Sequence, residues 1–333
     1  MSKIRLVDVA KAAGVSQTTV SRVMNNSGYV AENVKQAIEQ AAEAIGYVHP
    51  ERKRTIKHKN LIGIVSSRGK INSFFPNMSS ILEQTAAEKN YYCINVTSDR
   101  LDNHALAYHA SELAQIGVSA LVVTSFLAPA LNSDTRNLLL KLGLPVVFFE
   151  RTEGCHGFNR ILVDSTIGTY LATKHLINKG HRHLAYINFS RQAPVESMRL
   201  SGFNRAIDEV DPDKIRRTVV SCREITPRAG ANAIKEALQT DPEITGVVAW
   251  SDLFASGAIH IFQQLGKRIP EEVEIIGYDN ILAPHLPIPI GSIETPVEEM
   301  AALAINTIDR CLFMKSLPAP RTITLEPRLM GVE

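Results

Sequence analysis

From Leu61 onward the chain alternates short apolar runs with amphipathic stretches, and this alternation restricts the possible folds more than any other feature. An apolar run such as LIGIVSS predicts a parallel strand that is buried on both faces. Helical stretches near 77–89, 104–116 and 133–142 separate the first four runs, and a second series of five runs follows. Strands that alternate with helices form doubly wound sheets, so the sequence predicts a body of two α/β lobes.

Common catalytic and cofactor-binding motifs are absent from this body. No GxGxxG follows the first apolar run, and no GxxxxGK(S/T), nucleophile elbow or HExxH occurs anywhere. The four cysteines include no CxxC pair, which argues against a zinc site or a disulfide framework and suits a reducing compartment. Neither a secretion signal nor a membrane-spanning run is found. We therefore expect a cytoplasmic protein that is not an enzyme and has no cofactor, metal or membrane partner.

The first sixty residues predict a small all-α domain of three helices. Two short helices, Leu6–Ala13 and Gln17–Met24, are separated by Gly14, which tolerates the left-handed conformation of a tight turn. Ser16 is a suitable N-cap for the second helix. A third helix is predicted by apolar residues at helical spacing, which are Val34, Ile38, Ala41 and Ile45. Valines of the first two helices can pack on that stripe and form one small core.

This segment is also more basic than the rest of the chain. Residues 1–60 carry ten Lys/Arg against five Asp/Glu, whereas the remaining residues carry 26 against 29. A basic head on a slightly acidic body is typical of a module that binds a polyanion, although a solvated surface could carry the same charges.

The second helix carries side chains that could read DNA bases. In a helix-turn-helix this helix lies in the major groove, with its N-terminal residues against base edges. The residues there are Gln17, Thr18 and Arg22, and Gln can pair with adenine and Arg with guanine. Short polar side chains suited to phosphate oxygens lie at Ser16, Thr19, Ser21 and Asn25. An ordinary surface bundle is the alternative, but the compactness of the pattern favours DNA binding.

The string VDVAKAAGVSQTTVSRVMNN resembles the headpiece of the lactose-repressor (LacI) family of bacterial regulators. Further strings, including VDSTIGTYLATKHLINKGHRHLAYI, IIGYDN and GSIETPVEEMAALAI, are similar to the family's effector-binding core. The resemblance implies a homodimer on a pseudo-palindromic operator and a body that resembles periplasmic sugar-binding proteins, with a small molecule in the cleft between the lobes. It also implies that the chain crosses between the lobes near 162, 290 and 321.

These inferences divide the chain into a headpiece, a hinge and two lobes. The headpiece is expected at 1–48, the hinge at 49–60, the first lobe at 61–162 with 291–320, and the second lobe at 163–290 with 321–333. In this division the last strand, TITLEP, joins the second lobe.

The hinge departs from the pattern of the family that it resembles. It is basic, with Arg52 and Arg54 among its cations, and it keeps an apolar residue, Ile56, at the position where the family inserts a minor-groove wedge. It lacks the Asn and Ala that usually accompany the wedge. Two alternatives stay open here: a wedge helix with Ile56 in the groove, or a cationic tether held by phosphates alone.

Residues that follow the strands of the body are the candidates for effector binding, because ligands of open α/β sheets lie beyond the carboxyl ends of the strands. Arg199 and Asp279 are the strongest pair, since a guanidinium donates to oxygens and a carboxylate accepts from hydroxyls. The other candidates are Phe74, Phe75, Ser125, Glu150, Arg151, Ser251 and Asp252. For three of them another role stays open: Phe74 and Phe75 as core residues, and Asp252 as a helix cap.

Together these features predict a DNA-binding transcriptional regulator, by default a repressor, whose operator affinity changes when a sugar or sugar derivative binds between the lobes. A purine- or nucleoside-responsive or corepressor-dependent regulator stays open, as does a protein of another class, an enzyme or plain binding protein on the same body. A dimer is expected, with its interface at the helix near Asn77 and the stretch near Ala283.

Overall fold

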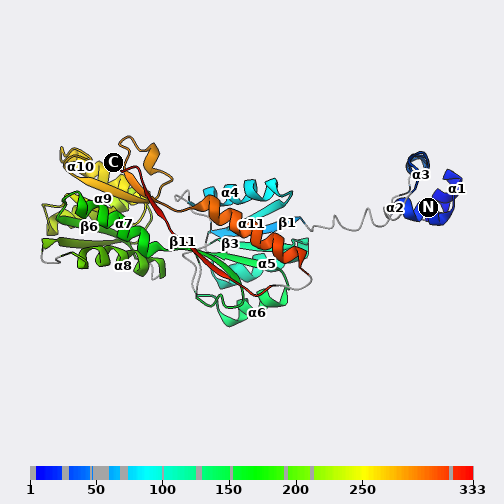
Figure 1. Ribbon diagram of the computed structural model, residues 1–333, viewed down its shortest axis with the longest axis horizontal. Helices are drawn as coiled ribbons and strands as arrows, with labels where there is room; N and C mark the ends of the chain where they lie inside the picture. The colour runs from blue at the N-terminus through cyan, green and yellow to red at the C-terminus, as the bar shows by residue number, and fades with distance from the viewer. Residues whose placement is uncertain are drawn as a thin grey trace. The chain divides into compact units, whose positions relative to one another are not determined.

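The computed structural model describes residues 5–24, 30–45, 47, 60–67, 74–99, 101–124, 130–150, 153–190, 194–210, 214–314 and 318–332. Contacts within the chain divide it into two compact units, Met1–His58 and Lys59–Glu333 (Figure 1). Each unit has a hydrophobic core of its own.

The first unit contains the three predicted helices, α1 (Leu6–Ala13), α2 (Gln17–Met24) and α3 (Glu32–Ala44). Gly14 ends α1 with a φ of 66°, in the left-handed region that the turn was expected to need. The predicted packing of valines on α3 is confirmed, because the fully buried side chains of this core are Val9, Val20 and Ile38.

The second unit contains two six-stranded sheets. The first sheet has the strand order β11-β5-β4-β3-β1-β2, and all its strands are parallel. Its strands are β1 (Leu61–Ser67), β2 (Tyr92–Ser98), β3 (Ala120–Thr124), β4 (Val146–Phe149), β5 (Asn159–Val163) and β11 (Thr322–Leu325). The helices of this lobe are α4 (Phe74–Glu88), α5 (Asn103–Ile116), α6 (Ser133–Lys141) and α11 (Val297–Phe313).

The second sheet has the order β12-β10-β9-β8-β6-β7, with only β12 antiparallel. Its strands are β6 (His183–Phe189), β7 (Arg216–Cys222), β8 (Gly246–Ala249), β9 (Glu274–Asp279), β10 (Gly291–Glu294) and β12 (Arg328–Met330). Its helices are α7 (Ser165–Asn178), α8 (Pro194–Asp208), α9 (Pro227–Thr240) and α10 (Asp252–Gln264), and a short 3-10 helix, η2, spans Ala283–His285. The predicted fold class, an all-α headpiece followed along the chain by two doubly wound lobes, is confirmed.

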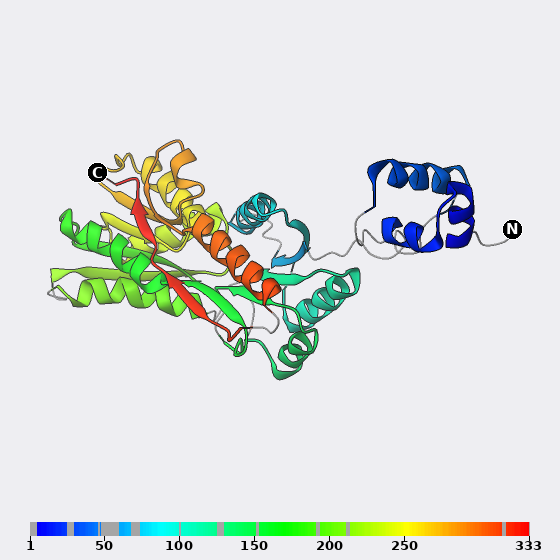
Figure 2. The ribbon, with the colours of Figure 1, turned by 45° about the vertical axis from the view of Figure 1, so that its right-hand side comes forward.

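Two of the three expected crossings between the lobes are displaced. Residues 291–320 were expected to return to the first lobe. This is wrong for β10, which pairs with β9 in the second sheet. Of the elements described in this range, only α11 returns, and it packs on α4. The expectation for TITLEP is also wrong, because β11 pairs with β5 in the first sheet. Figure 2 shows the chain continuing from β11 into β12, which closes the other sheet. Each short strand completes an open sheet edge, and local sequence does not specify which edge.

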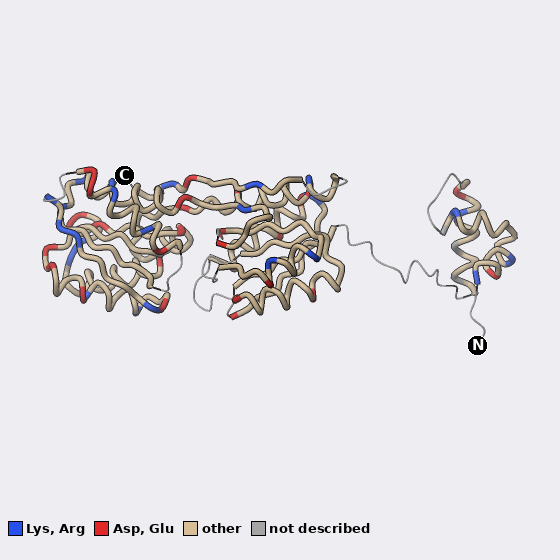
Figure 3. Tube along the Cα trace, turned by 90° about the horizontal axis from the view of Figure 1, so that it is seen from below, with Lys and Arg blue, Asp and Glu red and all other residues tan. Residues whose placement is uncertain are grey.

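Charged residues of both signs are interspersed over the second unit (Figure 3), in agreement with its nearly balanced composition. Among the helices that the structure describes, none is long and apolar enough to cross a membrane.

Candidate functional site

The surface of α2 carries the three residues that were predicted to read bases. Gln17, Thr18 and Arg22 are all exposed, whereas Val20 between them is fully buried in the headpiece core. Thr18 and Arg22 are four residues apart and therefore lie on the same face of the helix. The fold thus holds one side of α2 by its valines and leaves the polar side accessible.

Two of the predicted phosphate contacts also form the start of α2. The backbone N–H of Thr19 donates to Ser16 Oγ over 3.1 Å, which confirms the predicted N-cap, and the two hydroxyls lie 2.8 Å apart. Ser21 is partly buried. Asn25 lies outside the described residues, as do Arg52, Arg54 and Ile56 of the expected hinge.

In the second unit, Arg199 on α8 is enclosed by residues of β9 and by Trp250, which follows β8. Its Nη1 donates to the carbonyl oxygen of Trp250, and its Nη2 lies 3.7 Å from Asp279 Oδ1. The guanidinium carbon is 3.4 Å from the ring centroid of Tyr278 and 4.6 Å from that of Trp250. The two strongest sequence candidates for effector binding therefore lie beside each other, and two aromatic faces hold the cation in place.

Glu150, which follows β4 of the first lobe, lies close enough to this cluster to feel its charges. Burial raises the pKa of Glu150 to about 8, although the Val163 N–H, 2.5 Å from Glu150 Oε1, and the charge of Arg199 act in the opposite direction. Burial likewise raises the pKa of Asp279 to about 7, against the charge of Arg199. The charge of Arg199 therefore acts on two carboxyl groups from different lobes, of which Asp279 is in contact with it.

The backbone is left-handed at the same strand ends. Glu150 has a φ of 54°, Asp279 of 91° and Asn280 of 52°. Residues other than glycine rarely adopt this conformation, and it persists only where surrounding contacts fix the backbone. One such contact is the hydrogen bond of 3.1 Å from the Asn280 N–H to Ser292 Oγ. Strain of this kind is concentrated at ligand clamps and switch regions, which makes this region a candidate binding site.

Ser251 and Asp252 have structural roles that differ from the expected effector contacts. Ser251 Oγ accepts a hydrogen bond from the Phe254 N–H and caps α10, so Asp252 is not the cap. Asp252 Oδ2 accepts the N–H groups of Ile281, Leu282 and Ala283, and its Oδ1 accepts the hydroxyl of Ser292 over 2.6 Å. These four bonds anchor the segment after β9, a long-range role that the sequence pattern does not reveal.

Phe74 and Phe75 are core residues. They are 4% and 3% exposed and pack edge to face, with ring centroids 5.6 Å apart. The alternative that placed them in the core therefore applies, and contact of these rings with an effector stays a prediction. Ser125 and Arg151 lie outside the described residues.

Sequence reasoning missed several members of the cluster. Trp250 and Tyr278 are fully or almost fully buried against Arg199, and each immediately precedes a residue that was singled out. Outside the contacts of this cluster, Thr124 and Asn188 also lie at or next to the carboxyl ends of strands, β3 and β6. Their place at a strand end was the available signal, but one polar residue in an apolar run does not show which way its side chain points.

A second polar cluster lies at the amino-terminal end of β6 and in the segment between α9 and β8, at the opposite ends of the strands from Arg199. His183 Nδ1 lies 2.9 Å from Asp241 Oδ2, and Glu243 is also near this histidine. These three residues could offer ligands to a metal, but Asp241 Oδ2 also pairs with Arg216 and its Oδ1 accepts the Glu243 N–H. Its carboxylate is therefore already satisfied, and the geometry is that of an ion-pair network.

Glu274, the first residue of β9, leads to a prediction about stability in acid. Burial by itself would raise the pKa of Glu274, but hydrogen bonds with His181 and His175 outweigh burial and lower it from 4.5 to about 2. A depressed carboxyl pKa stabilises the fold above pH 4.5, and this contribution disappears as the pH falls toward 2. We expect Glu274→Gln to lose up to about 3 kcal/mol near neutral pH and almost nothing at the acid limit.

Urea unfolding of wild type and Glu274→Gln across that pH range measures the difference. Glu271→Gln, which changes an exposed carboxylate nearby, serves as the control and should follow the wild-type curve. A pH-independent difference for Glu274→Gln would show that the carboxylate charge is not responsible.

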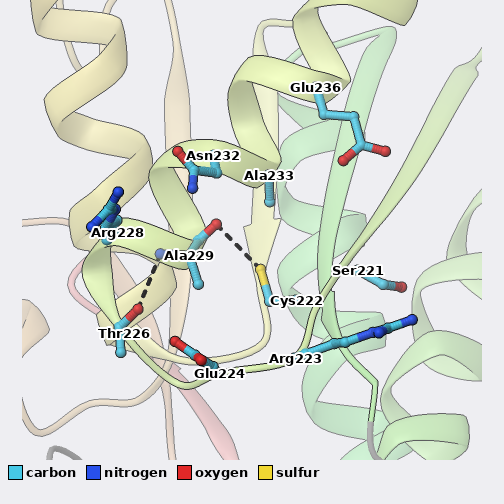
Figure 4. Close-up of a pocket in the computed structure, with 10 residues that line it drawn as sticks. All are labelled: Ser221, Cys222, Arg223, Glu224, Thr226, Arg228, Ala229, Asn232, Ala233 and Glu236. Carbon is cyan, nitrogen blue, oxygen red and sulfur yellow. Dashed lines mark hydrogen bonds between the residues drawn. The ribbon is translucent and has the colours of Figure 1, made fainter.

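A hollow of about 470 Å³ opens beside the end of β7 and the first turns of α9 (Figure 4). Thr226 Oγ1 accepts the Ala229 N–H over 3.1 Å, and Cys222 Sγ donates to the Ala229 carbonyl oxygen over 3.4 Å. Arg223 and Arg228 line it from exposed positions. None of the predicted effector residues lines this hollow, so it is separate from the Arg199 cluster.

Comparison with family models gives matches in both units. Residues 5–50 match the model described as bacterial regulatory proteins, lacI family, and residues 173–330 match a periplasmic binding protein-like domain. The headpiece and much of the body are therefore similar to known domains of these two kinds.

Similar proteins and structures span nearly the whole chain. The ribose operon repressor of Halalkalibacterium halodurans is 28% identical over 96% of this chain and 93% of its own length. The HTH-type transcriptional repressor PurR of Photorhabdus laumondii is 30% identical over 97% of this chain and 94% of its own length. The crystal structure of the Lac repressor dimer bound to operator has a TM-score of 0.78 at 18% identity, covering 99% of this chain and 98% of that one. A complex of the regulator CelR with cellobiose has a TM-score of 0.66 at 25% identity, covering 98% of both chains.

Proposed function

The chain belongs to the lacI family of bacterial regulatory proteins, and on this premise we infer that it is a sequence-specific DNA-binding repressor of transcription rather than an enzyme. It acts as a homodimer on operator DNA, and a small molecule bound between the lobes controls its affinity. The observation that carries this function is the exposed polar face of α2, with Gln17, Thr18 and Arg22, on a headpiece joined to a two-lobed body. We assign its place of action to the cytoplasm, where its DNA lies.

The mechanism is a linkage between two binding events. An effector that prefers one arrangement of the lobes shifts the population of that arrangement, and operator affinity changes by the same coupling free energy. Arg199, Asp279 and Glu150 are well placed for this, because they join strand ends of both lobes in one charged cluster. A relative named as the ribose operon repressor and a similar structure in complex with cellobiose support a sugar or sugar derivative as the effector class.

Deletion of residues 1–60 tests the division of labour. The full chain should select a pseudo-palindromic sequence from a random duplex library, whereas the truncated chain should bind no DNA and keep its ligand affinity. If the truncated chain selects the same sequence, the headpiece does not carry recognition.

We expect Gln17→Ala and Arg22→Ala each to reduce base discrimination by about 1–3 kcal/mol, because each removes a bidentate contact with a base edge. Gel shifts on the selected operator and on half-sites mutated one base pair at a time measure this. Gln36→Ala, an exposed change on α3, is the matched control and should leave discrimination intact. Full discrimination in both α2 variants would contradict the base-reading assignment.

The hinge distinguishes two mechanisms of operator binding. A minor-groove wedge at Ile56 predicts that Ile56→Ala weakens operator binding and removes the DNA bend, with little effect on non-specific binding. A cationic tether predicts instead that Arg52→Gln and Arg54→Gln make the slope of log affinity against log salt concentration shallower, by about one unit for each lost phosphate contact. We favour the tether, since clustered like charges oppose a paired helix until phosphates neutralise them. A bending assay across a salt series decides, and a bend lost in Ile56→Ala alone rules the tether out.

A further inference from the structure

Another hollow, of about 290 Å³, lies on the first lobe between α11 and the strands β5 and β11. Its lining includes Asn159, the first residue of β5, and Arg321, which immediately precedes β11. The hollow therefore extends to the amino-terminal ends of these strands, whereas Glu150 and Asp279 lie at the carboxyl ends of theirs. None of the candidate effector residues lines it, so it is a separate site.

Positive charge dominates this hollow. Arg160, Arg310 and Arg321 line it, and none of its lining residues is Asp or Glu. Arg310 is half-buried and Arg321 is exposed. Among the residues that the structure describes, no carboxylate pairs with either of these two guanidiniums. The next segment along the chain, 315–317, lies outside the described residues and contains one Lys and no acidic residue.

The guanidinium of Arg310 is the group that most needs a ligand. Its Nε is buried and has no hydrogen-bond partner within the described part of the chain. A buried donor without a partner costs free energy, so such a group in a folded protein usually binds a ligand or a water. The carboxylate of Asp309 is already engaged, because it accepts the Tyr91 hydroxyl over 2.7 Å and lies 3.8 Å from Lys89 Nζ. The C-terminal end of α11 offers only about half a negative charge, less than the charge of one guanidinium.

Two amide side chains of the hollow are oriented to donate hydrogen bonds. Asn306 Oδ1 accepts a hydrogen bond from Lys89 Nζ over 2.6 Å. Asn159 Oδ1 accepts the backbone N–H of Arg321 over 3.0 Å. The end of each amide that has no hydrogen bond among the described residues is therefore its NH2 group, which can only donate, as can a guanidinium. A ligand that fits these groups must accept hydrogen bonds and carry negative charge.

We propose that this hollow binds a small phosphate-bearing molecule, either inorganic phosphate or a phosphate monoester, whose oxygens accept from Arg310, Arg321 and the two amides. Guanidinium groups bind phosphate oxygens through paired hydrogen bonds, and a phosphate group with about two negative charges at neutral pH matches two guanidiniums. The volume is at the lower end of the range for ligand pockets, which favours a small molecule. Because the site lies apart from the effector cluster and the headpiece, the proposal does not depend on the proposed function.

Isothermal titration of the full chain at neutral pH tests the proposal, with inorganic phosphate, glucose 6-phosphate and uncharged glucose as probes. We expect at least one of the two phosphate probes to bind with a Kd below about 1 mM. Arg310→Gln and Arg321→Gln should each weaken that binding roughly tenfold or more, since each removes charge-assisted hydrogen bonds. Arg228→Gln, in the hollow of Figure 4, is the matched control and should bind as wild type does.

Arg321 is exposed, so Arg321→Gln keeps the test decisive if Arg310→Gln does not fold. Tighter binding of glucose 6-phosphate than of both phosphate and glucose identifies a monoester as the ligand, whereas equal or tighter binding of phosphate identifies the ion itself. Three results overturn the proposal: no binding of either phosphate probe up to about 10 mM, unchanged binding in a folded Arg310 or Arg321 variant, or an equal loss in Arg228→Gln.

Discussion

Replacement of Arg199 by Met should lower the free energy of unfolding of the body by about 3–5 kcal/mol at neutral pH. The reason is that the variant must either bury the Asp279 carboxylate without its partner or bind a proton there, and removal of one member of a buried ion pair costs more than the pair contributes. Because burial already raises the pKa of Asp279 to about 7, acid should protonate it and reduce the loss. Urea unfolding followed by tryptophan fluorescence measures this, since the chain's single tryptophan, Trp250, contacts Arg199.

Two further variants separate charge from packing. Arg199→Met combined with Asp279→Asn removes both charges and should recover a large part of the stability. Arg205→Met, on the exposed side of the same helix, breaks a surface pair with Glu209 and should change stability by less than about 1 kcal/mol. If the double variant is no more stable than Arg199→Met alone, packing of the side chain rather than its charge accounts for the loss.

Replacement of Ile38 by Ala should unfold the headpiece and reduce operator affinity by about 30-fold or more. Ile38 is fully buried at the centre of the three-helix core, and truncation of such a side chain costs about 2–5 kcal/mol. A core of this size has little stability to lose. A headpiece that must refold on DNA loses binding free energy equal to its cost of refolding. Each 1.4 kcal/mol of that cost lowers operator affinity roughly tenfold.

Gel shifts and ligand titration together measure the effect of Ile38→Ala. Effector binding should match that of wild type, because the headpiece and the body have separate cores. Gln36→Ala, on the exposed side of the same helix, should retain operator binding. Unchanged operator affinity in Ile38→Ala would mean that the headpiece folds without this core.

Local sequence was sufficient to predict the candidate DNA interface. α1 and α2 have the predicted bounds, and the Ser16 cap and the Gly14 turn have the expected geometry. Helix caps, glycine turns and the spacing of apolar side chains act over a few residues, so the sequence displays them directly. The exposure of Gln17, Thr18 and Arg22 follows from the same periodicity, because the valines of α2 face the core.

The apolar runs were also sufficient to predict the strands and helices of the two lobes. Which sheet each short strand joins, however, was decided only by the tertiary structure. β10 and β11 joined the sheets opposite to those expected: β10 lies between β12 and β9, and β11 forms the edge beside β5. The partner strand of a short strand has no local signature in the sequence. Asp252 and Phe75 follow strands along the chain, where ligand-binding residues of open α/β sheets are expected. Yet the carboxylate of Asp252 accepts hydrogen bonds from backbone N–H groups beyond β9, and Phe75 is buried in the core. Sequence placed Asp279 and Glu150 after strands and Arg199 on a helix. Only packing of the two lobes brought the charge of Arg199 to act on both carboxyl groups, while burial shifted their pKa values. Charge interactions and desolvation depend on distances across the fold, whereas periodicity records only which face of each element is buried.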